Sequence, residues 1–227
     1  MYKSQIFINP TQFNNENDFN SYPKTIDEDI SKLENIGCNA LFLPEVQEIY
    51  PKGLAKKKIV NNFRNILCDK FRPGHFDGVT TVVDLFFNMI KPTNSYFGEK
   101  DFQQVKIIQD LVKINHHNIK IIQCPSVRDK MGMSLSSRNS KFSNDQFKIF
   151  NVLGNKIKKH INLLTQNEIN NLDQLKIELL QNNINKIDYL EIRNENNLEI
   201  TKNYSEARLF IALYIGDIRI IDNFKLY

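Results

Sequence analysis

The sequence contains few cysteines, and they form no recognisable motif. Cys38, Cys68 and Cys124 lie far apart and show no CxxC spacing. An odd, scattered set of cysteines is typical of reduced thiols in a cytosolic protein, and it argues against a disulfide framework or a zinc site. We therefore expect a cytoplasmic protein with free thiols.

Long apolar runs are also missing from the sequence. No stretch has the length and hydrophobicity needed to cross a bilayer. Polar residues interrupt the opening stretch, MYKSQIFINPTQF, so it contains no apolar core of a signal peptide. We therefore expect no membrane partner.

The charges show no large excess of one sign, with 30 basic and 26 acidic residues and a net charge of +4. The run Lys56-Lys57-Lys58 has no interleaved aromatic residues, which a base-stacking groove would need. We interpret it as solvated surface and expect no nucleic-acid partner. The length of 227 residues allows one large domain or two small ones.

The first half of the chain alternates strand-like and helix-like patterns. Thr25, with Glu28 three positions later, has the spacing of a capping box, and Gly37 suits the position after a helix. Strands alternating with helices predict a parallel sheet that binds ligands at the carboxyl ends of its strands. The predicted strands are 5–9, 39–43, 94–98 and 119–124, and the predicted helices include 25–36 and 79–90.

After Pro125 the pattern changes. Helical stretches near 143–161 and 168–182 precede two strand-like runs, DYLEI and RLFIALYIGDIRIID. Gly216-Asp217 between apolar runs is typical of a two-residue hairpin turn. The sequence therefore predicts two domains: an α/β domain at 1–125 and a smaller α+β domain at 126–227.

The stretch GEKDFQQV, beginning at Gly98, lies where a predicted strand passes into a helix. A helix N-terminus offers free N–H groups and a positive dipole, both of which favour phosphate. Lys100 adds a positive charge there. Asp101 and Gln104 could bind a ribose hydroxyl, or they could form only a capping box.

Two further stretches carry groups that suit small anionic or polar ligands. LSSRN, from Leu135 to Asn139, combines hydroxyls with a guanidinium that can donate a planar fork to phosphate. Taken alone, we favour the alternative interpretation of this stretch, a turn with an exposed arginine. In NPTQF, the amides of Asn9 and Gln12 could hold a polar substrate or only satisfy the backbone of a loop.

A histidine and a group of acids have two interpretations each. His75 could be an acid–base group, but in a Pro-Gly turn we favour a local hydrogen bond. Asp27, Glu28 and Asp29 could hold magnesium, although acids are common in the first turn of a helix.

Together, and in this order, these motifs resemble the pantothenate synthetase family, the pantoate–β-alanine ligases. The resemblance covers the chain from residue 5 onward. The matching stretches are IFINPTQF, YPKTIDEDISKL, IYPKG, RPGHFDGVTTVV, YFGEKDFQQV, LSSRN and IGDIRIIDN.

The resemblance implies a fold and an activity. The fold would be α/β, with the Rossmann-like parallel sheet of the HIGH-type nucleotidyltransferase superfamily and a smaller C-terminal α+β domain. Family members join pantoate to β-alanine with ATP, through a pantoyl-adenylate intermediate. The family also implies magnesium with the nucleotide, and a homodimer.

Site residues follow from the resemblance position by position. Lys100 and Arg138 would act in catalysis through their charges. Gln12 and Gln104 would bind pantoate, with Gln12 also beside β-alanine and Asn9 near the same pocket. Magnesium would lie near Glu28 or Asp29. The ATP-binding residues would be Gly98, Glu99, Lys100, Asp101, Val127, Leu135, Ser136, Ser137 and Arg138.

The sequence departs from the family at its start. Family members carry an earlier strand and helix with a PTMGxLHxGH-like segment, whose histidines contact the phosphates of ATP. This chain begins at what resembles the second strand of the family. We expect unpaired strand edges and an incomplete phosphate site. Either the true start lies upstream, which we favour, or the chain is a decaying remnant, or a separate peptide supplies the unit.

Two alternatives to the ligase remain open from the sequence. One is another nucleotidyltransferase of the same superfamily; Gln12 and Gln104 argue against a phosphate substrate, which should recruit arginine instead. The other is a non-catalytic nucleotide-binding protein, which predicts saturable ATP binding without turnover that depends on pantoate.

Overall fold

The structure is a computed structural model, and it describes residues 1–13, 16–20, 22–23, 25–53, 56–166 and 172–227. Within these ranges, no helix combines the length and the hydrophobicity needed to span a bilayer.

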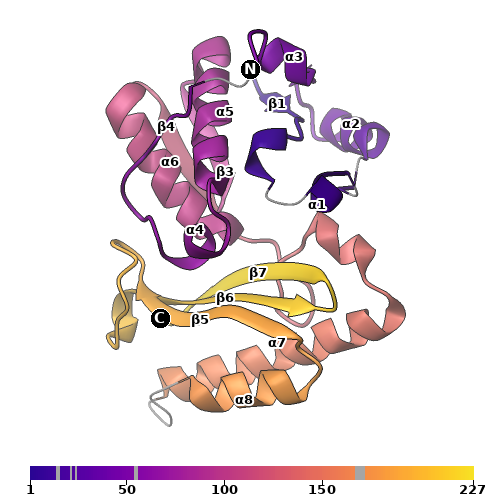
Figure 1. The fold of residues 1–227 in the computed structure, drawn as a ribbon, viewed down its shortest axis with the longest axis vertical. Coiled ribbons are helices and arrows are strands. Elements are labelled where there is room, and N and C mark those ends of the chain that lie inside the picture. Colours follow the sequence, from indigo (N-terminus) through magenta and orange to yellow (C-terminus); the bar gives the residue numbers. More distant parts are fainter. Residues whose placement is uncertain (14–15, 21, 24, 54–55, 167–171) are drawn as a thin grey trace.

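The first half of the chain contains two pairs of short parallel strands (Figure 1). β1 (Lys3–Gln5) pairs with β2 (Ala40–Phe42), and β3 (Asn94–Gly98) pairs with β4 (Lys120–Cys124). Both pairings are parallel, as the alternation of strand and helix patterns predicts, because each connection returns through at least one helix.

In the described part of the chain, these two pairs form separate sheets rather than one. Each strand therefore has a partner on one side only, and its other edge carries unpaired backbone groups. The helices of this half and its 3₁₀ helices are α1 (Glu16–Asn20), α2 (Ile26–Asn35), α3 (Val46–Ile49), α4 (Leu67–Phe71), α5 (His75–Ile90), α6 (Phe102–Asn115), η1 (Pro10–Gln12) and η2 (Glu99–Asp101).

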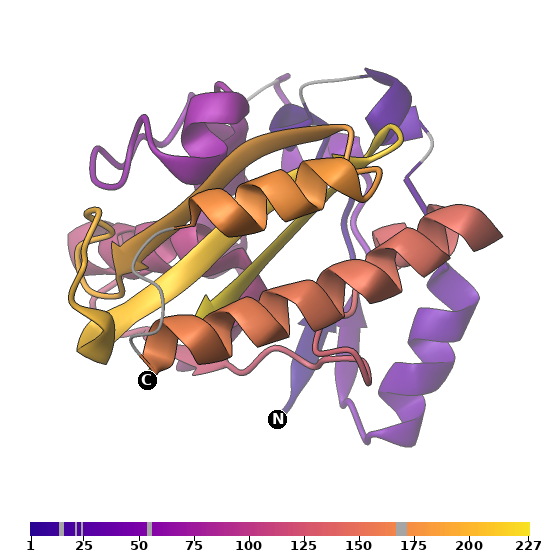
Figure 2. The same cartoon turned by 90° about the horizontal axis from the view of Figure 1, so that it is seen from below.

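The second half contains an antiparallel sheet in the order β5-β6-β7. The β6–β7 hairpin turns at Gly216 with a φ of 59°, which confirms the predicted turn. Figure 2 shows α7 and α8 along one face of this sheet. The elements are η3 (Ser137–Lys141), α7 (Asn144–Thr165), α8 (Asp173–Gln181), β5 (Lys186–Asn194), η4 (Tyr204–Glu206), β6 (Ala207–Ile215) and β7 (Ile218–Lys225).

The central strand β6 is buried on both faces. Leu209, Ile211 and Leu213 belong to the core under α7 and α8, whereas Phe210 and Ala212 belong to the core on the opposite side. Successive side chains of a strand point to opposite faces, so a strand that is covered twice becomes a continuous apolar run.

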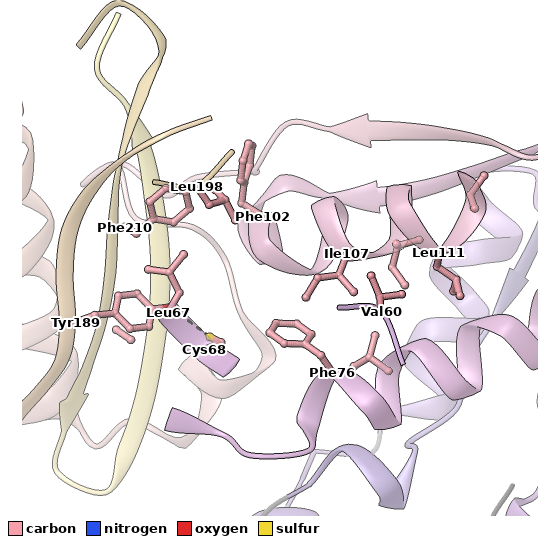
Figure 3. Close-up of a cluster of buried hydrophobic side chains, with 14 of the residues drawn as sticks. Val60, Leu67, Cys68, Phe76, Phe102, Ile107, Leu111, Tyr189, Leu198 and Phe210 are labelled. Atoms are coloured by element: carbon pink, nitrogen blue, oxygen red, sulfur yellow. Dashed lines mark hydrogen bonds between the residues drawn. The ribbon is translucent and has the colours of Figure 1, made fainter. Parts of the chain in front are cut away.

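The second face of the C-terminal sheet packs against the first half of the chain. Tyr189 and Phe210 from the sheet share one hydrophobic core with Leu67 of α4, Phe76 of α5 and Phe102 of α6 (Figure 3). This core crosses residue 125, so the two halves are held together by burial of apolar surface. The division into domains at that residue stays a prediction.

Three local expectations differ from the structure. β1 covers Lys3–Gln5 rather than 5–9. The capping box does not form: the Thr25 side chain accepts no capping hydrogen bond, and its hydroxyl donates to Asp29 Oδ2 at 3.1 Å. α5 starts at His75 rather than residue 79, because Gly74, with a φ of 78°, turns the chain directly into the helix.

Candidate functional site

A pocket lies at the carboxyl end of β3, between the two halves of the chain. It brings together residues from the β3–α6 junction, from the turn between α4 and α5, and from the last strand. The polar residues among its lining are Arg72, His75, Lys100, Asp101, Gln103, Gln104, Asp222 and Asn223.

The β3–α6 junction has the predicted order of strand, short turn and helix. β3 ends at Gly98, η2 covers Glu99–Asp101, and α6 begins at Phe102. The side chain of Asp101 makes no capping hydrogen bond, so the capping-box alternative is wrong. Asp101 and Gln104 line the pocket instead.

Lys100 connects the two predicted phosphate-binding stretches. Its Nζ donates a hydrogen bond of 3.1 Å to the carbonyl oxygen of Leu135. Burial lowers the pKa of Lys100, and the nearby positive charge of Arg138 acts in the same direction. An anion bound beside the ammonium group would favour its charged form, so the position suits a phosphate.

The LSSRN stretch contacts the N-terminal part of the chain through Tyr22. The hydroxyl of Tyr22 lies 3.2 Å from Ser137 Oγ, and the Arg138 guanidinium lies 5.5 Å from the centre of its ring. Ser136 Oγ accepts a hydrogen bond from the Arg138 backbone N–H at 3.2 Å. This stretch therefore forms a capped 3₁₀ turn. Its guanidinium is close enough to Lys100, which lines the pocket, to lower the pKa of that lysine.

Val127 lies beside the same stretch. Its carbonyl oxygen accepts a hydrogen bond of 2.9 Å from the Leu135 N–H, and its side chain is 70% exposed. The predicted adenine contact through the Val127 backbone stays a prediction. The structure places that backbone next to the predicted phosphate loop.

Asn9 is 1% exposed, and both the nitrogen and the oxygen of its side-chain amide form hydrogen bonds. Its Nδ2 donates to the Gly78 carbonyl at 3.1 Å, and its Oδ1 accepts from Tyr50 at 2.9 Å and from Thr11. These bonds hold η1 against α5. Asn9 therefore positions Gln12, which ends η1, and its own contact with a ligand stays a prediction.

Gln12 is tied to the pocket wall through its backbone. Its carbonyl oxygen accepts hydrogen bonds from His75 Nδ1 at 2.8 Å and from Arg72 Nη2 at 3.2 Å. Since Arg72 and His75 both line the pocket, Gln12 lies at its border. Gln104 lines it directly from α6.

His75 is buried and has a local role. Burial lowers its pKa to about 3, and the neighbouring guanidinium of Arg72 acts in the same direction. The neutral ring donates from Nδ1 to the Gln12 carbonyl and accepts from Arg72 Nη1 at Nε2, over 3.0 Å. This geometry favours the local interpretation of His75 over an acid–base role.

Two sets of pocket residues were not expected from the sequence. Arg72 precedes a Pro-Gly turn that opens a helix. A cation at the start of a helix was the only local sign that this residue could face a ligand. Asp222 and Asn223 lie on β7, within the IIDN stretch of the closing motif. Nothing in their local pattern indicates contact with residues of the β3–α6 junction.

The predicted magnesium ligands lie on an exposed helix. Glu28 and Asp29 lie on α2, and their carboxylates lie 3.6 and 3.8 Å from Lys32 Nζ. Across the described ranges, no group of three or more His, Cys, Asp or Glu residues could hold a metal ion. Both carboxylates pair with a lysine of the same helix, and their binding of magnesium stays a prediction.

Comparisons with known proteins identify the family to which the chain is similar. Residues 4–225 match the family model described as pantoate-beta-alanine ligase. A pantothenate synthetase of Legionella pneumophila (strain Lens) is 38% identical over 226 residues, covering 98% of this chain and 80% of that protein. One from Francisella tularensis subsp. novicida (strain U112) is 41% identical over 220 residues, covering 96% and 77%.

Solved structures agree as well. Pantoate-beta-alanine ligase from Francisella tularensis, complexed with beta-gamma ATP and beta-alanine, matches with a TM-score of 0.85 at 38% identity, over 99% of this chain and 78% of that one. Pantothenate synthetase from Thermus thermophilus matches with a TM-score of 0.85 at 29% identity, over 99% and 83%. The predicted Rossmann-like α/β fold is confirmed, and the chain belongs to the pantoate–β-alanine ligase family.

Proposed function

We propose that this chain condenses pantoate with β-alanine, using ATP and releasing AMP and pyrophosphate. The observation that carries the proposal is the pocket itself. It joins Lys100 and Gln104 to the turn that holds Gln12, in a chain whose family match covers residues 4–225. A lysine for phosphates and amides for a polar acid meet there.

The first step would be adenylation of pantoate. Its carboxylate oxygen attacks the α-phosphorus of ATP, a new O–P bond forms, and the bond to pyrophosphate breaks. Both partners are negatively charged, so Lys100 and Arg138 would offset their repulsion and stabilise the charge on the leaving pyrophosphate. Gln12 and Gln104 would orient pantoate without adding charge.

The second step would form the amide bond. The amine of β-alanine attacks the acyl carbon of the adenylate, loses a proton, and AMP leaves. No nucleophilic side chain is required, because the protein works by positioning the reactants. Arg72 would pair with a substrate carboxylate, since it lines the same pocket as Gln104 and donates to the Gln12 carbonyl.

Magnesium belongs to the proposal as a companion of ATP. Magnesium sites for nucleotides combine one or two carboxylates with phosphate oxygens. Glu28 and Asp29 are the candidate ligands, but both pair with Lys32. No step of the proposed reaction therefore depends on a magnesium ion held by these residues.

The assay that tests the function is pantoate-dependent exchange of labelled pyrophosphate into ATP, followed by pantothenate formation on addition of β-alanine. We expect exchange only when pantoate is present. Exchange driven by a different acid would favour another nucleotidyltransferase. ATP binding without any exchange, from a folded sample, would identify a nucleotide-binding protein instead.

A homodimer and a cytoplasmic location also belong to the proposal. The thiols of Cys38, Cys68 and Cys124 are all free, which agrees with a reducing compartment. Light scattering coupled to size-exclusion chromatography would measure the molar mass directly. A mass equal to one chain at assay concentration would contradict the dimer.

A further inference from the structure

Asp222 and Asn223 on β7 join the C-terminal sheet to both predicted ATP-binding stretches. They are 2% and 1% exposed, so their hydrogen bonds are shielded from water. Adjacent residues of a strand point to opposite faces, and this pair can therefore reach two different segments of the chain.

Asn223 holds the stretch that contains Lys100. Its Nδ2 donates to the carbonyl oxygens of Glu99 and Lys100 at 2.7 and 3.0 Å. Its Oδ1 accepts from Arg208 Nη1 at 2.5 Å, and Arg208 Nη2 lies 2.6 Å from Glu99 Oε2. The amide orientation is thus set, because Arg208 can only donate.

Asp222 holds the start of the second stretch. Its Oδ2 accepts a hydrogen bond of 2.8 Å from the Ser134 backbone N–H, immediately before Leu135. Both carboxylate oxygens also lie within 3.2 Å of Arg128 Nη1. A buried carboxylate with a charged partner and a backbone donor is costly to move, because each lost bond leaves an unpaired group.

These contacts close a ring of interactions. β7 anchors the η2 turn through Asn223, and through Asp222 it anchors Ser134, the residue just before the LSSRN stretch. The Lys100–Leu135 bond of 3.1 Å joins the two stretches directly. Phosphate oxygens that bind between them would need both at a set separation. Displacement by a fraction of an ångström would weaken every charge contact made there.

We propose that Asp222 and Asn223 are positioning residues that set the separation of the two ATP-phosphate-binding stretches. The proposal rests on the proposed function for its effect on ATP. Beyond the proposed function, it assigns the spacing of these two stretches to a buried pair of residues in the C-terminal sheet. Neither side chain contacts the reacting atoms in this role.

The test is Asn223→Asp, which keeps the shape and the acceptor for Arg208 but removes the N–H groups that bind Glu99 and Lys100. We expect the KM for ATP to rise about tenfold, the effect of a lost buried hydrogen bond. The KM for pantoate should stay close to the wild-type value. Asn203→Asp makes the same chemical change in an exposed cap of η4 and should leave both unchanged.

Hydrogen–deuterium exchange tests the positioning without relying on activity. Peptides covering 98–104 and 132–138 should exchange faster in Asn223→Asp than in the wild type or Asn203→Asp. If Asn223→Asp shows the deuterium-exchange rates and the KM for ATP of the wild type, the inference is overturned while the proposed function stands. Absence of pyrophosphate exchange in the wild type would contradict the proposed function. The deuterium exchange of the variants would still show whether Asn223 positions the two stretches.

Circular dichroism shows whether Asn223→Asp folds. If it does not fold, deuterium exchange is measured on Asp222→Asn and on the wild type instead. Asp222→Asn should speed exchange in the 132–138 peptide and leave 98–104 nearer the wild type. In the wild-type chain, the Ser134 amide should exchange slowly, because it donates to Asp222. Rapid exchange of that amide would overturn the inference by itself.

Discussion

Lys100 Nζ donates a hydrogen bond of 3.1 Å to the carbonyl oxygen of Leu135, 35 positions later in the chain. This bond places the one lysine of the β3–α6 junction against the backbone of the LSSRN stretch. A ligand that draws Lys100 toward its phosphates would compete with the Leu135 carbonyl. The lysine is therefore held at the position where the proposed reaction needs positive charge.

Replacement of that lysine should abolish adenylation and leave the fold intact. Lys100→Ala removes a charge that stabilises developing pyrophosphate, and we expect pantoate-dependent exchange to fall at least about 100-fold. Lys202→Ala, at an exposed lysine of the same chain, is the control and should keep wild-type exchange. Near-normal exchange in Lys100→Ala would exclude it from the phosphate site.

The buried His75 predicts how stability depends on pH. Its pKa falls from 6.5 to about 3 in the folded chain, because burial and Arg72 disfavour the charged ring. Between these values the unfolded state binds the extra proton, so His75 makes stability fall as the pH falls through this window. The largest contribution to the slope is about 1.4 kcal/mol per pH unit.

Urea unfolding of the wild type and His75→Asn at several pH values measures this contribution. The asparagine amide can still donate to the Gln12 carbonyl, but it does not titrate. We expect His75→Asn to lose less stability on acidification than the wild type. His117→Asn, at an exposed histidine, should follow the wild type. If the free energy of unfolding depends on pH equally in all three proteins, the His75 ring is not buried and neutral.

Gly78 predicts a steric effect on stability. A Cβ at this position of α5 would lie 2.5 Å from the Thr11 carbonyl oxygen, so η1 would have to move. Alanine favours a helix over glycine by about 1 kcal/mol, but we expect the clash to outweigh it and to destabilise Gly78→Ala by about 1–3 kcal/mol.

Chemical denaturation of Gly78→Ala and Gly98→Ala provides the comparison. A Cβ on Gly98 would meet nothing within 4 Å. Gly98→Ala should therefore stay close to the wild type in stability. A Gly78→Ala protein as stable as the wild type would show that η1 does not pack against α5 as closely as the structure has it.

The candidate metal ligands predict small effects. Glu28→Gln and Asp29→Asn each remove one carboxylate partner of Lys32, and an exposed pair of this kind contributes about 0.5 kcal/mol. We expect the magnesium concentration that gives half-maximal exchange to stay near the wild-type value. A rise of about tenfold in that magnesium concentration would correspond to a lost ligand contact, and it would identify Glu28 or Asp29 as a magnesium ligand.

Local patterns were sufficient for much of the fold. The Gly216-Asp217 turn and the helix after GEKD depend on neighbouring residues, and the alternation of strands and helices predicts the parallel pairing of β3 with β4. The structure has each of them. The expected cap at Thr25 is missing, because its side-chain oxygen accepts no backbone N–H, and its hydroxyl donates to Asp29. The sequence pattern alone could not show whether the Thr25 oxygen would meet a backbone N–H.

The candidate site was only partly accessible from the sequence. Lys100 and Gln104 follow from a strand that passes into a helix, and both line the pocket. Arg72 lines it too, but its partner His75 has an ambiguous role until its burial is known. The burial of a ring depends on what packs over it, and local spacing carries no information on that.

The sequence by itself determined the family, the alternation of strands and helices, and the residue types suited to ATP and pantoate. Only the tertiary structure decided that Asn223 holds the carbonyl of Glu99, 124 positions away, and that Asn9 is engaged beneath η1. Helix and turn signals act between near neighbours. Contacts of this range exist only after apolar burial has brought β7, α5 and the β3–α6 junction together.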